Sequence, residues 1–130
     1  MRKVLIMDDD PIHHKIAGAF INKYTILKDY QSYLNPVNAL IDLTDAYCAE
    51  KEMPELIFLD LNMPELNGWE FLETFSKISA LTGQRTKVYI ITSSIDKNDR
   101  EKAYTYPCVK GFHSKPLSNE FFDRVIREAC

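Results

Sequence analysis

The stretch Leu56-Ile57-Phe58-Leu59-Asp60 is a short apolar run that ends on a carboxylate. Four consecutive apolar side chains without polar alternation indicate a strand that is buried on both faces, as in a parallel sheet covered by helices. Residues 4–7 (VLIM) and 88–91 (VYII) have the same character, and 109–113 (VKGFH) is a weaker version. The sequence therefore predicts a parallel sheet, with the alternating residues 29–34 as a fifth strand at its edge.

The segments between these runs carry apolar residues at helical spacing, which predicts helices that pack on the sheet. The predicted apolar faces are Ile12, Ile16, Ala19 and Phe20; Val37, Leu40, Ile41 and Thr44; Phe71, Leu72, Phe75 and Ile78; and Phe121, Phe122, Val125, Ile126 and Ala129. Pro11 and Pro36 each follow a capping residue, and Asp96 is placed to cap a polar helix that we expect to be loosely held. Five alternating strand–helix units predict an α/β fold with right-handed crossovers and helices on both faces of the sheet.

Composition limits the classes of protein that this chain can belong to. It has 130 residues, 45% of them hydrophobic, and a formal net charge of −3. These values predict one folded domain over residues 1–130 without an output domain, and the mild acidity disfavours a nucleic-acid binder. Three cysteines without a C-x-x-C pair favour the reducing cytosol over a disulfide framework or a zinc site. No apolar stretch is long enough for a signal peptide or a membrane span, so we expect a cytoplasmic protein that does not bind membranes.

Polar residues follow the apolar runs at the point where each predicted strand ends. They are Asp8, Asp9, Asp10, Asp60, Thr92, Ser93, Ser94 and Lys115. Taken singly, each has an ordinary explanation as a helix cap or a turn residue. Because the carboxyl ends of parallel strands meet at one edge of an open sheet, we expect carboxylates, a hydroxyl and an ammonium group to gather there.

Such a cluster has specific chemistry. Two carboxylates about 4 Å apart repel by roughly 4 kcal/mol at an effective dielectric constant near 20, which a raised pKa or a bound cation relieves. Oxygen ligands alone favour a hard cation such as Mg²⁺. With Mg²⁺ held by Asp8, Asp9 and Asp60 and with Lys115 opposite, the site would attract phosphate and suit in-line phosphoryl transfer to a carboxylate.

Four motifs occur in order along the chain: VLIMDDDP at 4–11, LIFLDLNMPELNGWEFL at 56–72, VYIITSS at 88–94 and VKGFHSKPL at 109–117. Together they resemble the response-regulator receiver domain of two-component signalling, and the resemblance covers essentially the whole chain. It implies a flavodoxin-like (βα)5 three-layer sandwich in which a five-stranded parallel sheet has the strand order 2-1-3-4-5.

The resemblance also implies a phosphoacceptor and a metal site. Asp60 matches the aspartate that becomes phosphorylated and that also contacts the metal. Asp9 matches the carboxylate that binds Mg²⁺ directly, and Asp8 the one that acts mainly through metal-bound water. Asn62 occupies the position whose backbone carbonyl completes the metal shell.

Three further positions match the residues that sense the phosphoryl group in this family. Thr92 matches the hydroxyl that moves to hydrogen-bond the phosphoryl oxygens, and Lys115 matches the lysine that pairs with them. Phe112 matches the aromatic switch, whose ring turns inward when Thr92 moves.

The resemblance implies a stand-alone, bacterial response regulator of the chemotaxis-regulator type. We expect it to accept a phosphoryl group on Asp60 from a histidine kinase or a histidine phosphotransfer protein, in a reaction that depends on Mg²⁺. It would catalyse its own phosphorylation and dephosphorylation, and we do not expect it to be an enzyme otherwise. The face made by the fourth helix, fifth strand and fifth helix changes on phosphorylation, and passes the signal to a downstream protein, through a phosphorelay or through a homodimer.

Two alternatives stay open. In a haloacid-dehalogenase-like phosphatase, Asp8 would be the nucleophile and Asp10 the general acid/base, but the segment LDLNMP would then have no explanation. A degenerate receiver that only binds partners is disfavoured, because every catalytic residue type is present. Within the second motif, Trp69 is expected to pack in the core or on a helix face rather than to serve as a substrate platform.

Overall fold

The computed structural model describes residues 3–7, 19, 29–33, 36–49, 54–61, 68–81, 83, 86–92, 96–114 and 119–129. Its strands are β1 (Lys3–Met7), β2 (Asp29–Tyr33), β3 (Leu56–Leu59), β4 (Lys87–Thr92) and β5 (Val109–Ser114). They form one sheet in the order β2-β1-β3-β4-β5, and each neighbouring pair is parallel. The predicted sheet and strand order are confirmed.

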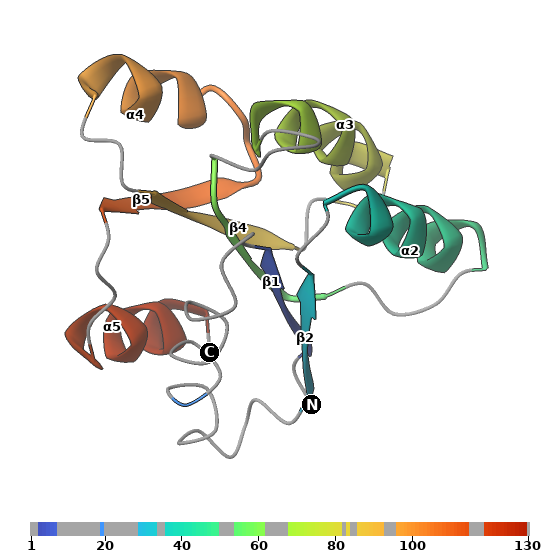
Figure 1. Cartoon of the computed structure of the whole chain (residues 1–130), viewed down its shortest axis with the longest axis horizontal. Coiled ribbons are helices and arrows are strands. Elements are labelled where there is room, and N and C mark those ends of the chain that lie inside the picture. Colours follow the sequence, from blue (N-terminus) through green and yellow to red (C-terminus); the bar gives the residue numbers. More distant parts are fainter. Residues whose placement is uncertain are drawn as a thin grey trace.

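Helices cover both faces of this sheet. Figure 1 shows α2 (Pro36–Cys48), α3 (Gly68–Leu81) and α4 (Lys97–Ala103) on one side and α5 (Asn119–Ala129) on the other. The three-layer sandwich is therefore confirmed. The helix predicted to begin at Pro11 lies outside the described residues, except for Ala19, which is helical. Across the described ranges, none of the helices is both long enough and apolar enough to pass through a lipid bilayer.

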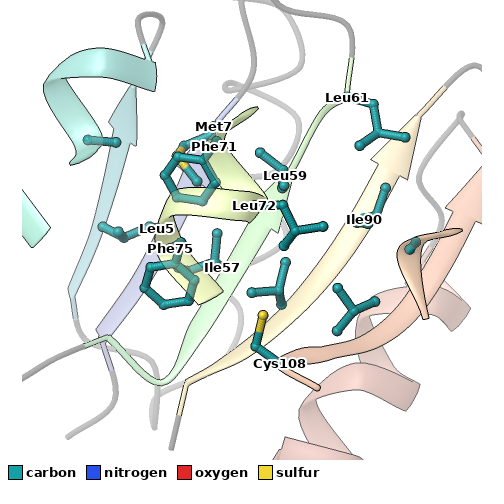
Figure 2. Packing of buried hydrophobic residues seen from close by; sticks show 14 of the residues in the cluster. Leu5, Met7, Ile57, Leu59, Leu61, Phe71, Leu72, Phe75, Ile90 and Cys108 are labelled. Atoms are coloured by element: carbon teal, nitrogen blue, oxygen red, sulfur yellow. The ribbon is translucent and has the colours of Figure 1, made fainter. Parts of the chain in front are cut away.

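Alternate strand residues build a core on each face of the sheet, which explains why the strand sequences show no polar alternation. Figure 2 shows one of them, called here the main core, between the sheet and the helices α2 to α4. Its buried members are Leu5, Met7, Ala39, Leu43, Ile57, Leu59, Leu61, Phe71, Leu72, Phe75, Val88, Ile90, Ala103, Cys108 and Val109. On the opposite face, Phe58 contacts the rings of Tyr89 and of Phe121 from α5.

The predicted apolar face of α2 was wrong in part, since Leu40 packs partly buried against the main core but the other three predicted residues do not. Ala39 and Leu43 are the residues that α2 buries in the main core, whereas Val37 and Ile41 are 40% and 52% exposed and Thr44 is exposed. The buried face is turned from the predicted one by about a third of a helical turn. Apolar residues occupy more than half of the circumference of α2, so spacing alone did not select a face. Close packing against the sheet selected the buried face, because the small side chain of Ala39 lets the helix approach closely.

Start signals for two helices are confirmed. Pro36 is the first residue of α2. The Asp96 side chain accepts a hydrogen bond of 2.9 Å from the backbone N–H of Asn98 and caps α4. Within α4 the buried residue is Ala103, so this helix rests on the protein through a small apolar area.

The beginning of α3 is packed directly on the chain that leaves β3. The N–H of Gly68 donates to the carbonyl oxygen of Leu61 at 2.8 Å. A Cβ atom on Gly68 would lie 2.5 Å from the Leu61 Cα and 2.7 Å from the Asp60 carbonyl oxygen. Only glycine permits this approach, because both neighbours are backbone atoms that cannot turn away.

We expect Gly68→Ala to lower the free energy of unfolding by about 2 kcal/mol, because α3 or the Asp60–Leu61 backbone must shift to admit the methyl group. Urea unfolding at neutral pH measures the loss. Gly83→Ala is the control: its φ of 81° is strained for alanine, but no heavy atom lies within 4 Å of the added Cβ. Equal stabilities of the two variants would contradict the steric explanation.

Candidate functional site

Asp60 lies directly after β3, at the carboxyl end of the sheet, and is 6% exposed. Its N–H donates to the carbonyl oxygen of Met7 at 2.9 Å. Met7 is the last residue of β1, and Asp8 and Asp9 follow it in the sequence. The end of β1, from which the predicted metal ligands continue, is thus fixed beside Asp60.

The ends of β4 and β5 reach the same edge of the sheet. Leu59 pairs with Ile90 in the β3–β4 register, which puts Thr92 just beyond the level of Asp60. Thr92 is fully buried and pairs with Ser114, the last residue of β5. Lys115 is the next residue in the sequence. Parallel pairing therefore brings to one edge the four strand ends that precede or carry the predicted site residues.

Only part of the predicted site falls within the described residues. Asp60, Thr92 and Phe112 are described, and the first two lie at the expected edge. Asp8, Asp9, Asn62 and Lys115 lie outside the described ranges, as does Asp10. The chemical roles of all these residues stay predictions.

The described part of this sheet edge offers an oxygen ligand of the kind that a hard cation binds. Asp60 supplies a carboxylate, and oxygen donors of this kind are the ones that Mg²⁺ prefers. The 2.9 Å hydrogen bond between Asp60 and Met7 brings the β1 and β3 ends together, as ligands from two segments require. Among the described residues, no three His, Cys, Asp or Glu side chains gather into a metal-binding group. A metal site at this edge would therefore need the acids that follow Met7 in the sequence, and their role stays a prediction.

Adjacent residues of β5 contact opposite layers of the sandwich, as the alternation of a strand requires. Phe112 pairs with Ile90 and packs, half-buried, against the main core. His113 faces α5, where its ring meets the Phe121 ring edge-to-face at 4.3 Å between centroids. The predicted switch position is therefore joined by one peptide bond to a residue that holds α5.

His113 also forms a polar contact with α5. A guanidinium nitrogen of Arg124 lies 3.0 Å from its Nδ1 and donates to the ring. Burial lowers the pKa of His113 to about 4, the positive charges of Arg124 and Arg100 act in the same direction, and Glu128 opposes them. At neutral pH the ring is uncharged, as an acceptor of an arginine hydrogen bond must be. Sequence reasoning missed this pair, because nothing local to either residue indicates that β5 and α5 bring them together.

The fold and this edge define a class of signalling domain, and comparison with known proteins agrees. Residues 4–127 match the family model of the response regulator receiver domain. The chain belongs to this family and is the receiver domain of a response regulator in two-component signalling, as the sequence motifs predicted.

Two relatives and two solved structures illustrate the similarity. A protein-glutamate methylesterase/protein-glutamine glutaminase of Treponema denticola is 32% identical over 123 residues, which are 91% of this chain and 29% of that protein. Response regulator Rre1 of Synechocystis is 24% identical over 125 residues, 95% of this chain and 49% of Rre1. The crystal structure of a two-component response regulator from Cytophaga hutchinsonii has a TM-score of 0.87 at 28% identity and covers 99% of this chain and 96% of that chain. The chemotaxis protein CheY4 of Vibrio cholerae has a TM-score of 0.77 at 18% identity, and the match covers 100% of this chain and 99% of that chain. The two proteins therefore share the fold.

The chain spans between 29% and 52% of the lengths of the curated relatives that it matches. Those proteins therefore extend well beyond the receiver domain that they share with it.

The lowered pKa of His113 makes stability depend on pH. Its pKa in the folded protein, about 4, lies below the ordinary value of 6.5. As the pH falls, His113 therefore binds a proton in the unfolded chain before it does so in the folded protein. The contribution of His113 is complete above pH 6.5 and is lost as the pH falls toward 4. We expect about 2 kcal/mol to be lost between about pH 7 and pH 4.5.

The measurement is urea unfolding of the wild type and of His113→Gln at several values of pH in this window. Their difference in the free energy of unfolding should shrink on acidification, because the variant has no imidazole to protonate. A difference that stays constant with pH would contradict the assignment.

Proposed function

We propose that Asp60 accepts a phosphoryl group from the phosphohistidine of a histidine kinase or a histidine phosphotransfer protein, in a reaction that requires Mg²⁺. The observation that carries the proposal is the buried carboxylate of Asp60 at the carboxyl edge of the sheet, hydrogen-bonded through its backbone to the end of β1. Membership of the receiver family supports the same chemistry.

In the proposed reaction, a carboxylate oxygen of Asp60 attacks the phosphorus, and the bond from the phosphorus to the donor histidine nitrogen breaks. The product is an aspartyl phosphate, and the donor histidine leaves as the neutral imidazole because its other ring nitrogen already carries a proton in the phosphorylated form. Asp8, Asp9, Asp60 and the carbonyl of Asn62 would hold Mg²⁺, which supplies charge neutralisation for the phosphoryl oxygens. The protein's own task is to position Asp60, and the backbone contacts on either side of it do so.

Lys115 and Thr92 would then respond to the new charge of about −1.5 to −2. Lys115 pairs with the phosphoryl oxygens, and the Thr92 hydroxyl moves to hydrogen-bond them. Because Thr92 is fully buried, its movement leaves space that a neighbouring side chain has to fill. Phe112 is half-buried in the next strand and is the residue that we propose turns inward.

We propose that the signal leaves through the surface of α4, β5 and α5, either to a downstream protein or through a homodimer. In this proposal the chemistry of the chain is limited to its own phosphorylation and dephosphorylation. A cytoplasmic location is proposed as well, since Cys48 and Cys108 are free thiols, as expected in a reducing compartment.

Asp60→Asn should abolish phosphorylation, because an amide cannot form the acyl phosphate. The test is labelling with acetyl phosphate and Mg²⁺, followed by mass-spectrometric mapping of the modified residue. Asp45→Asn is the matched control, since it removes an exposed carboxylate on α2, and it should be labelled like the wild type.

Removing Mg²⁺ with a chelator should stop labelling of the wild type and leave its circular dichroism spectrum unchanged.

For the phosphoacceptor test, retained labelling of Asp60→Asn would overturn the assignment of Asp60. Labelling mapped to Asp8 would instead favour the haloacid-dehalogenase-like alternative.

Thr92→Ala should still accept a phosphoryl group but transmit it poorly, because the hydroxyl that senses the phosphoryl oxygens is gone. Hydrogen exchange of β5 and α4, compared with and without phosphorylation, measures transmission. Thr86→Ala is the control at the opposite end of β4, where the Thr86 hydroxyl donates to the carbonyl oxygen of Pro54 at 2.6 Å. That variant should lose about 1 kcal/mol of stability and keep the response. An unchanged exchange response in Thr92→Ala would contradict its role.

A further inference from the structure

Two side-chain contacts join the α4 region to α3. The Lys102 ammonium lies 4.4 Å from the centroid of the Trp69 ring, a cation–π geometry. The Tyr106 hydroxyl, just beyond the end of α4, donates to Oε2 of Glu73 at 2.9 Å. We call these four residues, Trp69, Glu73, Lys102 and Tyr106, the α3–α4 latch. Among the described residues, α4 enters the main core through Ala103, and the latch adds two side-chain contacts between the α4 region and α3.

The spacing of the latch residues makes the two contacts act together. Trp69 and Glu73 are four residues apart on α3, so they share one face of that helix. Lys102 and Tyr106 have the same spacing and contact that face in the same order. Burial, and then the Glu73 carboxylate, raise the pKa of Tyr106, which keeps its hydroxyl protonated as a donor.

The α3 end of the latch is tied to the phosphoacceptor segment. Trp69 directly follows Gly68, which donates a hydrogen bond to Leu61 and has no room for a Cβ against the backbone of Asp60 and Leu61. A shift of the backbone at Asp60 therefore has to move the first turn of α3. Close-packed backbone transmits such a shift instead of absorbing it.

The α4 end of the latch lies next to the predicted switch. Ala103 is a buried member of the main core, and Phe112 packs against the same core while it is still half-buried. Inward movement of the Phe112 ring, into the space that Thr92 leaves, changes the packing of this layer, to which α4 contributes Ala103. A contact that restrains α4 therefore opposes the inward position of the ring.

We propose that the α3–α4 latch couples Asp60 to α4 through α3 and restrains α4 in its present position, so that it opposes phosphorylation of Asp60. This inference rests on the proposed function. By thermodynamic linkage, a latch that weakens binding of a phosphoryl mimic must itself be weakened when that mimic binds. A cation–π contact at an exposed position corresponds to an effect of about two- to fivefold on such an equilibrium.

The test compares Lys102→Gln with Lys97→Gln. Both substitutions remove one positive charge from an exposed position of α4, but only Lys102 lies over Trp69. Lys97 contacts Glu101 at 4.0 Å in an exposed pair, which contributes little. Calorimetric titration with beryllofluoride, a phosphoryl mimic, in the presence of Mg²⁺ gives the affinity at the Asp60 site.

We expect Lys102→Gln to bind beryllofluoride about two- to fivefold more tightly than the wild type, and Lys97→Gln to bind it with wild-type affinity. Lys102→Arg keeps a cation over the ring and should return the affinity to the wild-type value. Tyr106→Phe deletes the hydrogen bond to Glu73 but keeps the ring on the core, and should also tighten binding. Unchanged or weaker binding by Lys102→Gln, or equal tightening by Lys97→Gln, would overturn the proposal.

Hydrogen exchange separates failure of the latch from failure of the proposed function. Without beryllofluoride, the amides of α4 should exchange about two- to fivefold faster in Lys102→Gln than in Lys97→Gln. If the wild type binds no beryllofluoride with Mg²⁺, the proposed function fails, and the coupling to Asp60 fails with it. Faster exchange in that case would still support the latch as a restraint on α4, and equal exchange would overturn that as well.

Discussion

The hydrogen bond from the Asp60 N–H to the Met7 carbonyl oxygen, 2.9 Å long, continues the β1–β3 pairing by one residue beyond β3. The candidate site depends on this step, because it places Asp60 against the end of the strand that leads to Asp8 and Asp9. The register behind it rests on side-chain packing, because β3 is apolar at all four positions and its pattern does not distinguish the two faces. A slip by one residue would exchange its side chains between two cores that are packed for different shapes.

Supports from the two helical layers meet at the same edge. On one side, the first turn of α3 lies against the Asp60–Leu61 backbone, at a distance that only Gly68 permits. On the other, His113 binds α5 through Phe121 and Arg124, next in the chain to Phe112. In the proposed mechanism, a change at Asp60 reaches the helices by two routes, one through β4 and β5 and one through α3. The α3–α4 latch is the outer end of the second route.

Strands were the easiest elements to predict, since a strand that is buried on both faces, such as Leu56–Leu59, appears in the sequence as an uninterrupted apolar run. The positions of Asp60 and Thr92 at the edge of the sheet followed from the predicted strands, because a parallel sheet brings every carboxyl end to one edge. The face of α2 was predicted correctly only at Leu40, because Val37 and Ile41 are as apolar as the residues that the helix buries. Contacts such as Lys102 with Trp69 were not predicted, since they join residues far apart in the sequence that carry no local signal of each other.

The order of apolar runs and polar strand ends along the chain was thus sufficient to predict the sheet, the α/β class and the residue types at the carboxyl edge. Burial of a strand on both faces leaves a pattern in the local sequence, and parallel strands all end at the same edge. The close approach of Gly68 to Asp60, the neutral His113 held by Arg124 and the attachment of α4 to α3 were decided only when the layers packed. Each of them depends on distances between elements, and no spacing within one segment specifies how closely two segments pack.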